Sequence, residues 1–447
     1  MIDHTHDPVA RTWLAPDSED THAFALQTLP YGAFSLPGHD NVRRIGVGIA
    51  GHILDLAAAQ QLGLVDDLDG ALRPALRVPH LNALLALTPA QWSALRHRLF
   101  ALFVDDDSGW KGARDVIRQC LVPMAAAHMH LPFDVGDYTD FYASIHHATN
   151  VGTMLRPEQP LLPNYRHVPI GYHGRASSIV VSGTPVRRPS GQVLPQGQTA
   201  PRFGPSQRLD YELEVGLVIG GENALGEPVP IGRALDRVFG VVLLNDWSAR
   251  DIQAWEYQPL GPFLAKSFAT TISAWVVPLA ALAPRRVAVV RAASDPPPLP
   301  YLLDAADQSS GALDLDIEVR LSSTRMRELG EPPHLVSRSN MRDLYWTPAQ
   351  LVAHHTSNGC NLRPGDLLGT GTVSGPQPES RGCLLERTWR GTDPITLPTG
   401  ETRRFLEDGD RVEFGAAVGL TCCGEIVPAR DLTDHGRMPG MAPGAPD

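Results

Sequence analysis

Glycine and proline occur along the whole length of this chain, and their even spread constrains the fold more than any other feature. The 447 residues include 41 glycines and 40 prolines. Both residues interrupt helices and strands, and both favour tight turns. Many short strands joined by turns fit this pattern better than a bundle of long helices does. We therefore predict a β-rich α+β protein.

Hydrophobic periodicity marks a smaller first part of the chain. Arg43–Leu56 has a strand-like pattern and Ala57–Leu64 resembles a short helix, whereas Pro89–Phe103 and Ala113–Ala127 carry helical apolar spacing. Proline and glycine then break the helical spacing at Leu131–Asp137. We expect a domain boundary at that break.

The second part shows recurrent strand signals, most of them bounded by Gly, Pro or Asp. The predicted strands are Ser178–Ser182, Glu212–Ile219, Val238–Leu244, Ile317–Leu321, Leu367–Gly371 and Arg411–Phe414. Two long polar or proline-rich stretches, Pro189–Pro205 and Ala283–Pro300, are expected to be surface excursions or functional loops. These patterns predict three units: residues 1–130, a catalytic domain over residues 131–438, and a disordered tail over residues 439–447.

Composition excludes several classes of partner. A formal net charge of −11 and no Lys/Arg-rich run argue against nucleic-acid binding. The first 20 residues are polar and acidic, and no stretch is long and apolar enough to span a membrane. Five cysteines without CxxC spacing predict free thiols in a reducing compartment. We expect a cytoplasmic protein whose partner is a small molecule.

Glu212 and Glu214 are the first candidate functional pair. In LDYELEVGLVIGG they lie two residues apart in a strand-like segment, so their side chains point to one face. Adjacent carboxylates repel one another unless a proton, an arginine or a cation lies between them, and a divalent metal is one resolution. An isolated pair of this kind also occurs on a solvated strand face. The apolar run that follows favours a buried strand instead.

Asp246 ends an apolar strand and precedes a helical segment in VVLLNDWSARDIQAWEY. Asp246, Arg250, Gln253 and Tyr257 follow helical spacing and would form one polar helix face. Asp246 as a simple helix N-cap is the alternative.

Asp140, Ser144 and His147 in DFYASIHHATN share the same helical spacing. A carboxylate and a histidine base would then face one pocket, although Asp140 as an N-cap and a structural histidine explain the pattern equally well.

Two further signals are weaker when they are taken alone. Lys266 and Thr270 form an i, i+4 pair in GPFLAKSFATT, where a lysine among apolar neighbours requires an anionic partner unless it extends to the surface. Leu367–Gly375 (LLGTGTVSG) is consistent with a strand that ends in a turn rich in Gly, Thr and Ser. Such a turn offers N–H groups and hydroxyls to an anion, but it is also a common loop.

Together these segments resemble the fumarylacetoacetate hydrolase family. The resemblance rests on GDYTDFYASIHHATNVG, LLPNYRHVPIGYHGRASSIVVSGTPVRRP, LDYELEVGLVIG, VVLLNDWSARDIQAWEYQPLGPFLAKSFATTISAWVVP and NGCNLRPGDLLGTGTVSGPQPESRGCLLE. It covers the chain from about residue 137 to the C-terminal strands, and an additional N-terminal domain fits it too. The expected fold is a small SH3-like β-barrel followed by a large mixed β-roll catalytic domain, and a homodimer is expected.

The resemblance also implies roles for individual residues. The metal site implied for Mg²⁺ or Ca²⁺ comprises Asp140, Glu212, Glu214, Asp246, Lys266 and Thr270. The implied substrate-contacting residues are Tyr142, Arg156, Tyr172, Gln253, Tyr257 and Thr372. His147 matches the general base and Glu386 the carboxylate that orients it. His146 departs from the glutamine of animal members, Ile145 departs from an arginine, and the Arg285–Asp307 stretch is atypical.

The implied reaction is metal-dependent hydrolysis of the diketo acid 4-fumarylacetoacetate to fumarate and acetoacetate, the last step of tyrosine and phenylalanine catabolism. A different acylpyruvase or decarboxylase would share the metal and enolate chemistry. A non-catalytic metal-binding module would have lost the base and the ligands, which are all present in this sequence.

Overall fold

The computed structural model describes residues 2–14, 24–106 and 109–430. The predicted tail, residues 439–447, lies outside the described residues. Among the helices of the described segments, none is long and apolar enough to cross a membrane.

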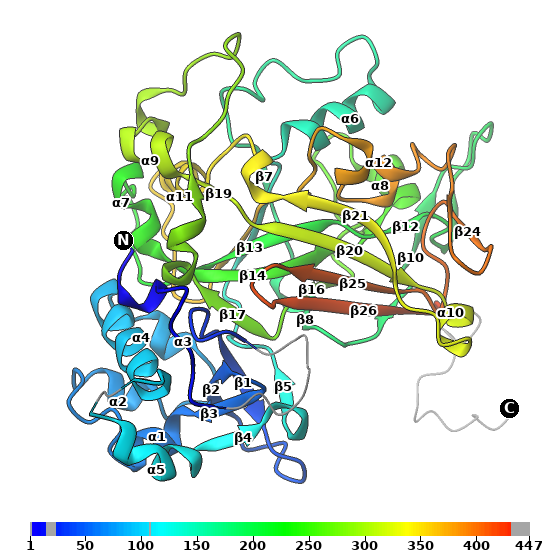
Figure 1. Cartoon of the computed structure of the whole chain (residues 1–447). Coiled ribbons are helices and arrows are strands. Elements are labelled where there is room, and N and C mark those ends of the chain that lie inside the picture. The colour runs from blue at the N-terminus through cyan, green and yellow to red at the C-terminus, as the bar shows by residue number, and fades with distance from the viewer. Residues whose placement is uncertain (1, 15–23, 107–108, 431–447) are drawn as a thin grey trace, which may run out of the picture.

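One large sheet runs through both parts of the chain (Figure 1). In sheet order its main strands are β4 (Leu121–Pro123), β3 (His52–Asp55), β2 (Arg44–Ile49), β1 (Tyr31–Ser35), β17 (Trp275–Pro278), β14 (Val238–Asp246), β13 (Leu213–Ile219), β22 (Leu367–Gly369), β6 (Tyr138–Phe141) and β7 (Gly171–His173). Off this path, β5 (His128–His130) pairs with β1, and β16 (Thr270–Ile272) pairs with β14 and with β8 (Ile179–Val181). The first part of the chain is therefore hydrogen-bonded to the second through β1 and β17.

The N-terminal strands follow the expected hydrophobic pattern. Arg43–Leu56 contains the hairpin of β2 and β3, and its turn places Ala50 and Gly51 at positive φ. Among the described strands β4 pairs only with β3, so the strand order does not confirm closure into an SH3-like barrel. That detail stays a prediction.

A second, five-stranded sheet covers one side of the large one. Its order is β21 (His334–Asn340), β20 (Asp316–Ser322), β25 (Arg411–Ala416), β26 (Thr421–Val427) and β9 (Val186–Arg187). Two-stranded sheets form from β10 (Ser190–Val193) and β11 (Arg202–Pro205), β12 (Leu209–Asp210) and β15 (Ser248–Ala249), β18 (Arg286–Val287) and β19 (Ala312–Leu313), and β23 (Ile395–Thr396) and β24 (Thr402–Arg403). The prediction of a β-rich α+β fold is confirmed.

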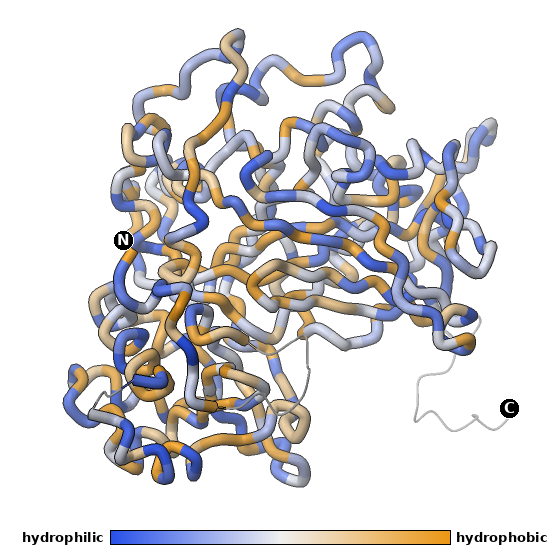
Figure 2. The backbone as a smooth tube through the Cα atoms, in the orientation of Figure 1, coloured by the Kyte–Doolittle hydropathy of each residue, from blue (hydrophilic) through white to orange (hydrophobic). Residues whose placement is uncertain are grey.

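The central strands are buried on both faces. In β13, Leu217 belongs to the core shared with the second sheet, whereas the next residue, Val218, belongs to the core of the N-terminal helices. Strands that are apolar on both faces read as continuous hydrophobic runs, which Figure 2 shows through the middle of the molecule. Between two such cores the sheet is a rigid platform for polar side chains at its strand ends.

The helices are short and border the sheets. They are α1 (Leu56–Gln61), α2 (Leu72–Ala75), α3 (Asn82–Leu85), α4 (Pro89–Phe103), α5 (Arg114–Arg118), α6 (Ile145–Leu155), α7 (Ile231–Ala234), α8 (Arg250–Glu256), α9 (Ala305–Ser310), α10 (Thr324–Glu328), α11 (Pro348–Thr356) and α12 (Leu384–Arg387). The predicted helix Pro89–Phe103 has the same bounds as α4, because Thr88 and Gln91 form a capping box around a proline in the first turn.

The prediction of helical structure over Ala113–Ala127 is wrong in the middle of the segment, although Met124–Ala126 beyond it forms a 3-10 helix. Only Arg114–Arg118 is α-helical, and the following residues Leu121–Pro123 pair with β3. Apolar spacing in so short a segment fits a helix and a strand alike, and the open edge of β3 decides between them.

Gly152 permits a close contact that helps to fix helix α6. An added Cβ would lie 1.7 Å from the carbonyl oxygen of Pro160. We expect Gly152→Ala to displace the segment around Pro160 and to lower the free energy of unfolding by about 1–3 kcal/mol. Denaturant titration measures the change. Gly70→Ala is the matched control, because a Cβ there meets no atom within 4 Å. Equal stability of the two variants would contradict the assigned contact.

Candidate active site

The order of four neighbouring strands brings the predicted carboxylates together. Asp246 ends β14, Glu212 and Glu214 lie at the start of the adjacent β13, and Asp140 lies in β6, with only β22 between β13 and β6. One oxygen from each of the four side chains lies within 4.8 Å of the others, and all four residues are buried. The structure thus assembles the proposed ligand set without help from any other segment.

A glycine in β22 makes room for this cluster. Gly369 pairs with Gly216 on one side and with Asp140 on the other. A Cβ at Gly369 would lie 2.5 Å from Asp140 Oδ1 and 3.0 Å from Glu214 Oε2. Any side chain there would fill the space in which the carboxylates converge. The absence of a side chain at Gly369 in β22 therefore leaves space for carboxylates from β13 and β6 to converge.

Two buried cations hold one side of the cluster. Lys266 Nζ lies 2.5 Å from Glu212 Oε2 and 2.6 Å from Asp246 Oδ2. Arg250 Nη1 lies 2.8 Å from Glu212 Oε1. Burial alone would lower the pKa of Lys266, but Asp246 and Glu212 raise it above its ordinary value. Lys266 therefore stays charged and neutralises carboxylates. A protonated amine has no lone pair to offer a metal, so Lys266 acts here as a cation and not as a ligand.

The remaining carboxylates carry more charge than these cations balance. Burial and the neighbouring Asp246 raise the pKa of Asp140, and although Lys266 opposes them, the pKa is raised to about 8. Burial and the neighbouring Asp140 likewise raise the pKa of Glu214 well above its usual range. For Glu212 burial also acts upward, but Lys266 and Arg250 outweigh it and lower the pKa. The cluster accordingly needs a proton or a further cation.

The arrangement fits a hard divalent cation. Asp140 Oδ1 and Glu214 Oε1 are buried and have no hydrogen-bond partner within the described segments. All four donors are carboxylates, which are the ligands that Mg²⁺ and Ca²⁺ prefer. Tyr172 donates to Asp140 at 2.9 Å and to Asp246 at 2.8 Å, and Thr270 donates to Asp246 at 3.3 Å. These bonds orient the ligand oxygens toward one point.

Two local predictions about this cluster are wrong. Asp140 does not share a helix face with Ser144 and His147, because Asp140 pairs in β6 while Ser144 caps α6. Asp246 does not begin a helix with Arg250, Gln253 and Tyr257, since it pairs with Thr270 as the last residue of β14 and α8 begins at Arg250. Asp140, Asp246 and Arg250 nevertheless lie at one site, because strand ends and the start of α8 adjoin here.

His147 and Glu386 form a buried pair beside the carboxylates. His147 Nδ1 lies 2.5 Å from Glu386 Oε2, although 239 positions separate them in the sequence. Burial would raise the pKa of Glu386, but His147 and the hydrogen bonds to the carboxylate lower it to about 2. An ionised Glu386 accepts a hydrogen bond from Nδ1–H, and in the neutral imidazole this tautomer leaves the lone pair on Nε2.

Further donors saturate Glu386. Ser374 Oγ and Asn150 Nδ2 each donate at 2.8 Å, and Cys383 Sγ donates at 3.2 Å. Ser374 comes from the predicted Gly/Thr/Ser turn after β22, whose Gly371 N–H donates to Glu214 at 3.1 Å. This turn therefore serves both the carboxylate cluster and the histidine pair.

A second ion pair joins the two groups. Asp210 Oδ2 accepts a hydrogen bond from Arg250 Nε at 2.9 Å, and Arg250 also contacts Glu212. The same Asp210 carboxylate accepts the backbone N–H groups of Leu384 at 2.8 Å and Leu385 at 2.9 Å, at the start of α12. Helix α12 carries Glu386, so Asp210 links the position of that helix to the carboxylate cluster.

The predicted substrate-contacting residues divide into two groups. Tyr142 packs against His147 with ring centroids 5.1 Å apart, Thr372 is buried with an unpartnered hydroxyl, and Gln253 accepts from Arg250 at 3.1 Å. Arg156 follows α6 as an exposed residue, and Tyr257 follows α8, half-buried. In the described part of the chain, neither Arg156 nor Tyr257 makes a contact with the carboxylate cluster or with the His147–Glu386 pair.

A cavity reaches the carboxylate cluster from outside. It has a volume of about 190 Å³, and its lining includes Tyr172, Asp246, Lys266 and Thr270. Phe263 lies at the same cavity and is largely exposed.

Several residues of this site were not identified from the sequence. Arg250 was noted only as part of a polar helix face, and Asp210, Asn150, Ser374 and Cys383 were not singled out as site residues. Asp210 directly precedes the YELE segment and had a usable signal, because a buried aspartate requires a cationic or N–H partner. Nothing local distinguishes Asn150 or Cys383.

The raised pKa of Asp140 predicts how stability depends on pH. Its unfolded pKa is about 4 and its folded pKa is about 8. Its contribution to stability is therefore fully present below the unfolded pKa and is lost as the pH rises through the folded pKa. Metal-free Asp140→Asn protein should melt about 2 °C or more above metal-free wild type at pH 8.5. The difference should shrink toward pH 5.

Differential scanning calorimetry at pH 5 and pH 8.5 measures the Tm difference between the two proteins. Repeating it with Mg²⁺ or Ca²⁺ measures the effect of the metal. A bound metal should raise the Tm of the wild type and leave that of Asp140→Asn nearly unchanged. Asp236→Asn, a change at an exposed ion pair, is the matched control. A pH-independent difference between wild type and Asp140→Asn would show that the carboxylates do not repel one another as described.

Comparison with known proteins agrees with this architecture. Residues 27–132 match the family described as fumarylacetoacetase N-terminal, and residues 138–427 match fumarylacetoacetate (FAA) hydrolase C-terminal. The chain is 48% identical to the fumarylacetoacetase of Arabidopsis thaliana over 419 residues, covering 92% of this chain and 97% of that one. It is 46% identical to the fumarylacetoacetase of Homo sapiens over 423 residues, covering 93% and 98% of the two chains.

A solved structure also shares the fold. The fumarylacetoacetate hydrolase from the psychrophile Exiguobacterium antarcticum superposes with a TM-score of 0.50 at 17% sequence identity, covering 90% of this chain and all of that one. On the match of both its parts and its identity to curated members, this chain belongs to the fumarylacetoacetate hydrolase family.

Proposed function

We propose that this chain hydrolyses 4-fumarylacetoacetate to fumarate and acetoacetate. The observation that carries the proposal is the joint presence of a four-carboxylate cluster and a buried histidine–glutamate pair in a chain 46–48% identical to fumarylacetoacetases over more than 90% of its length. The overall step consumes one water: the bond between the fumaroyl carbonyl carbon and its neighbour breaks, the hydroxyl joins the carbonyl carbon, and the departing carbon gains a proton.

His147 is the proposed base. With Nδ1 bound to ionised Glu386, Nε2 is free to take a proton from water as the water attacks the carbonyl. The carboxylate of Glu386 stabilises the imidazolium that results. Ser374 and Asn150 hold this carboxylate in place, so the ring cannot turn away. Tyr142 packs edge-to-face against the imidazole and restricts it from the other side.

Asp140, Glu212, Glu214 and Asp246 are proposed to hold Mg²⁺ or Ca²⁺, supported by the unpartnered oxygens of Asp140 and Glu214. When bound, such a cation supplies Lewis-acid chemistry, polarising a ketone oxygen and stabilising developing negative charge. Lys266 adds a second positive charge on the same side, and Thr270 orients Asp246. Tyr172, Gln253, Tyr257 and Thr372 are proposed to contact the substrate around them.

The direct test is loss of the ultraviolet absorbance of 4-fumarylacetoacetate with purified protein. Activity should disappear with a chelator and return with added Mg²⁺ or Ca²⁺. A related acylpyruvate that lacks the distal carboxylate should react more slowly. Full activity in a preparation shown to be free of metal would contradict the assignment of the four carboxylates.

His147 and its neighbour His146 give the sharpest mutational prediction. His147→Ala should lower kcat by about 10²–10⁴-fold with metal still bound, because a positioned base is lost. His146→Gln should be nearly silent, since among the described residues His146 makes no hydrogen bond to Glu386 and is half-buried elsewhere on α6. Glu386→Gln should also lower kcat, by a substantial part of the factor expected for His147→Ala.

Single-turnover cleavage under saturating metal distinguishes the two histidines, and bound metal is quantified in each variant. An inactive His146→Gln enzyme beside an active His147→Ala enzyme would reverse the assignment.

Arg156 is proposed to bind a carboxylate of the substrate. Its exposed guanidinium follows the helix that carries His147, and it has no ion pair among the described residues. Arg156→Lys should raise KM by about tenfold, since a bidentate pair becomes a single contact. Its Tm should remain that of the wild type. Unchanged KM and kcat in this variant would exclude the role.

A homodimer in the cytoplasm is the proposed state. An exposed apolar face supports the dimer: Trp255, Phe203, Leu260, Phe263 and Leu264 are all exposed. Hydrogen bonds connect the elements that carry them, because Trp255 donates to Gln192 of β10 and Glu256 accepts from the N–H of Phe263. Exposed apolar surface of this kind favours association. Sedimentation equilibrium distinguishes a dimer from a monomer.

We also propose a division of the chain at about residue 131. Residues 1–130 would form the N-terminal unit, with an SH3-like barrel as its expected form, and residues 131–438 the catalytic unit. The family matches over residues 27–132 and 138–427 support this boundary.

A further inference from the structure

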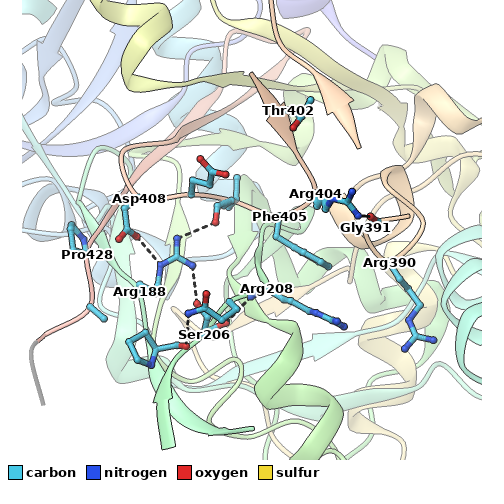
Figure 3. Close-up of a pocket in the computed structure, with 15 residues that line it drawn as sticks. Arg188, Ser206, Arg208, Arg390, Gly391, Thr402, Arg404, Phe405, Asp408 and Pro428 are labelled. Carbon is cyan, nitrogen blue, oxygen red and sulfur yellow. Dashed lines mark hydrogen bonds and ion pairs between the residues drawn. The ribbon is translucent and has the colours of Figure 1, made fainter. Parts of the chain in front are cut away.

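A large groove lies on the surface away from the carboxylate cluster (Figure 3). Its volume is about 800 Å³, and its walls come from three segments around residues 205–208, 402–408 and 428–429, together with Arg188 and the turn at residues 390–391. None of the proposed catalytic, metal-binding or substrate-contacting residues lines it. The groove is therefore a separate feature of the molecule.

The groove is cationic although the chain as a whole is acidic, with a net charge of −11. Four arginines line it: Arg188, Arg208, Arg390 and Arg404. The two acidic residues at its edge are already engaged, because Asp408 binds Arg188 at 2.7 Å and Glu407 binds Arg403 at 3.4 Å. Within the described segments Arg208, Arg390 and Arg404 have no carboxylate partner. The lining thus carries four guanidinium groups against two carboxylates, an excess of positive charge.

Two of these guanidinium groups are held in place by backbone carbonyls. Arg390 donates from Nη1 to Met154 at 2.8 Å, and Arg404 donates from Nη1 to Gly391 at 2.5 Å. Each bond uses one of five N–H groups, so the rest of each guanidinium remains available. The guanidinium of Arg208 lies 5.9 Å from the centre of the buried Phe405 ring. Figure 3 shows the three side chains around that ring.

The backbone that presents Arg390 is strained. Trp389 and Arg390 have φ values of 47° and 61°, the left-handed region that favours glycine, and Gly391 follows at 87°. Two consecutive residues with side chains rarely adopt this conformation, and each costs about 1 kcal/mol or more. The turn directs the Arg390 side chain back to the end of α6, where it bonds to Met154. Strain that places a cation in a groove is typical of a binding site.

We propose that this groove binds a small organic polyanion, with two or more phosphate or carboxylate groups held by Arg208, Arg390 and Arg404. Planar guanidinium groups bind both kinds of oxyanion through paired hydrogen bonds. A volume of about 800 Å³ suits a metabolite rather than a single inorganic ion. Phe405 provides an apolar floor for the carbon skeleton. The proposal does not depend on the reaction proposed above.

Calorimetric titration of the metal-saturated protein tests the site at low ionic strength. The probes are fructose 1,6-bisphosphate and tricarballylate, which carry phosphate and carboxylate groups respectively. Saturable binding of either probe supports the site, and the tighter probe identifies the preferred oxyanion. Arg208→Gln/Arg404→Gln should weaken this binding by about tenfold or more, because two charged contacts are lost.

Arg73→Gln/Arg233→Gln is the matched control, since it removes the same charge at exposed arginines outside the groove. It should bind the probes as the wild type does. Both double variants should retain wild-type activity and Tm. The proposal is overturned if neither probe binds the wild type, or if the groove variant binds as tightly as the control. It is also overturned if the groove variant becomes monomeric where the wild type is a dimer, because the groove would then be a subunit contact.

Discussion

Four carboxylates share one buried space in this protein, and most of the surrounding structure serves to hold their charge. Like charges so close together cannot all remain ionised in a region that excludes water. Lys266 and Arg250 pair with the side formed by Glu212 and Asp246; they lower the pKa of Glu212, whereas burial keeps the pKa of Asp246 raised although Lys266 opposes it. Asp140 and Glu214 keep raised pKa values and unpartnered oxygens. Cations of the protein thus balance the negative charge on one side of the cluster, and a divalent cation suits the side formed by Asp140 and Glu214.

The fold supplies this cluster through strand order rather than through any local motif. Strands β14, β13, β22 and β6 are neighbours, yet Asp140 and Asp246 are more than one hundred positions apart in the chain. Gly369 in the intervening β22 lets Asp140 and Glu214 approach across it. Apolar cores on both faces keep the strands rigid, so the oxygens are positioned before any ligand arrives. Such preorganisation lowers the cost of binding a metal.

The sequence predicts those parts of the structure whose causes are local. Helix α4 was predicted to the residue because its capping box and first-turn proline are contiguous with its apolar pattern. Strands β13, β14 and β22 of the central sheet were predicted because they are fully buried and read as apolar runs, whereas β1, β6, β16 and β17 were not. The convergence of Glu212 and Glu214 was predicted from side-chain alternation, which needs no tertiary information, although β13 begins one residue after Glu212.

Prediction failed where long-range pairing decides the conformation. Asp140 and Asp246 were assigned to helix starts from their spacing, but hydrogen bonds to β22 and β16 place them in strands. No local pattern could join His147 to Glu386 across 239 positions, and only resemblance to a family suggested that pair. Asp210 was not singled out because its partners are backbone N–H groups of a distant helix.

Asp210 also explains why the two halves of the site form one unit. Its carboxylate binds Arg250, which binds Glu212 of the cluster, and it accepts the first N–H groups of α12, which carries Glu386. Glu212 is therefore connected through two hydrogen-bonded ions, Arg250 and Asp210, to the helix that carries Glu386. Buried networks of this kind allow little independent movement, because each lost bond leaves an unpaired buried charge. The base and the carboxylate cluster are consequently connected by two buried side chains, Asp210 and Arg250.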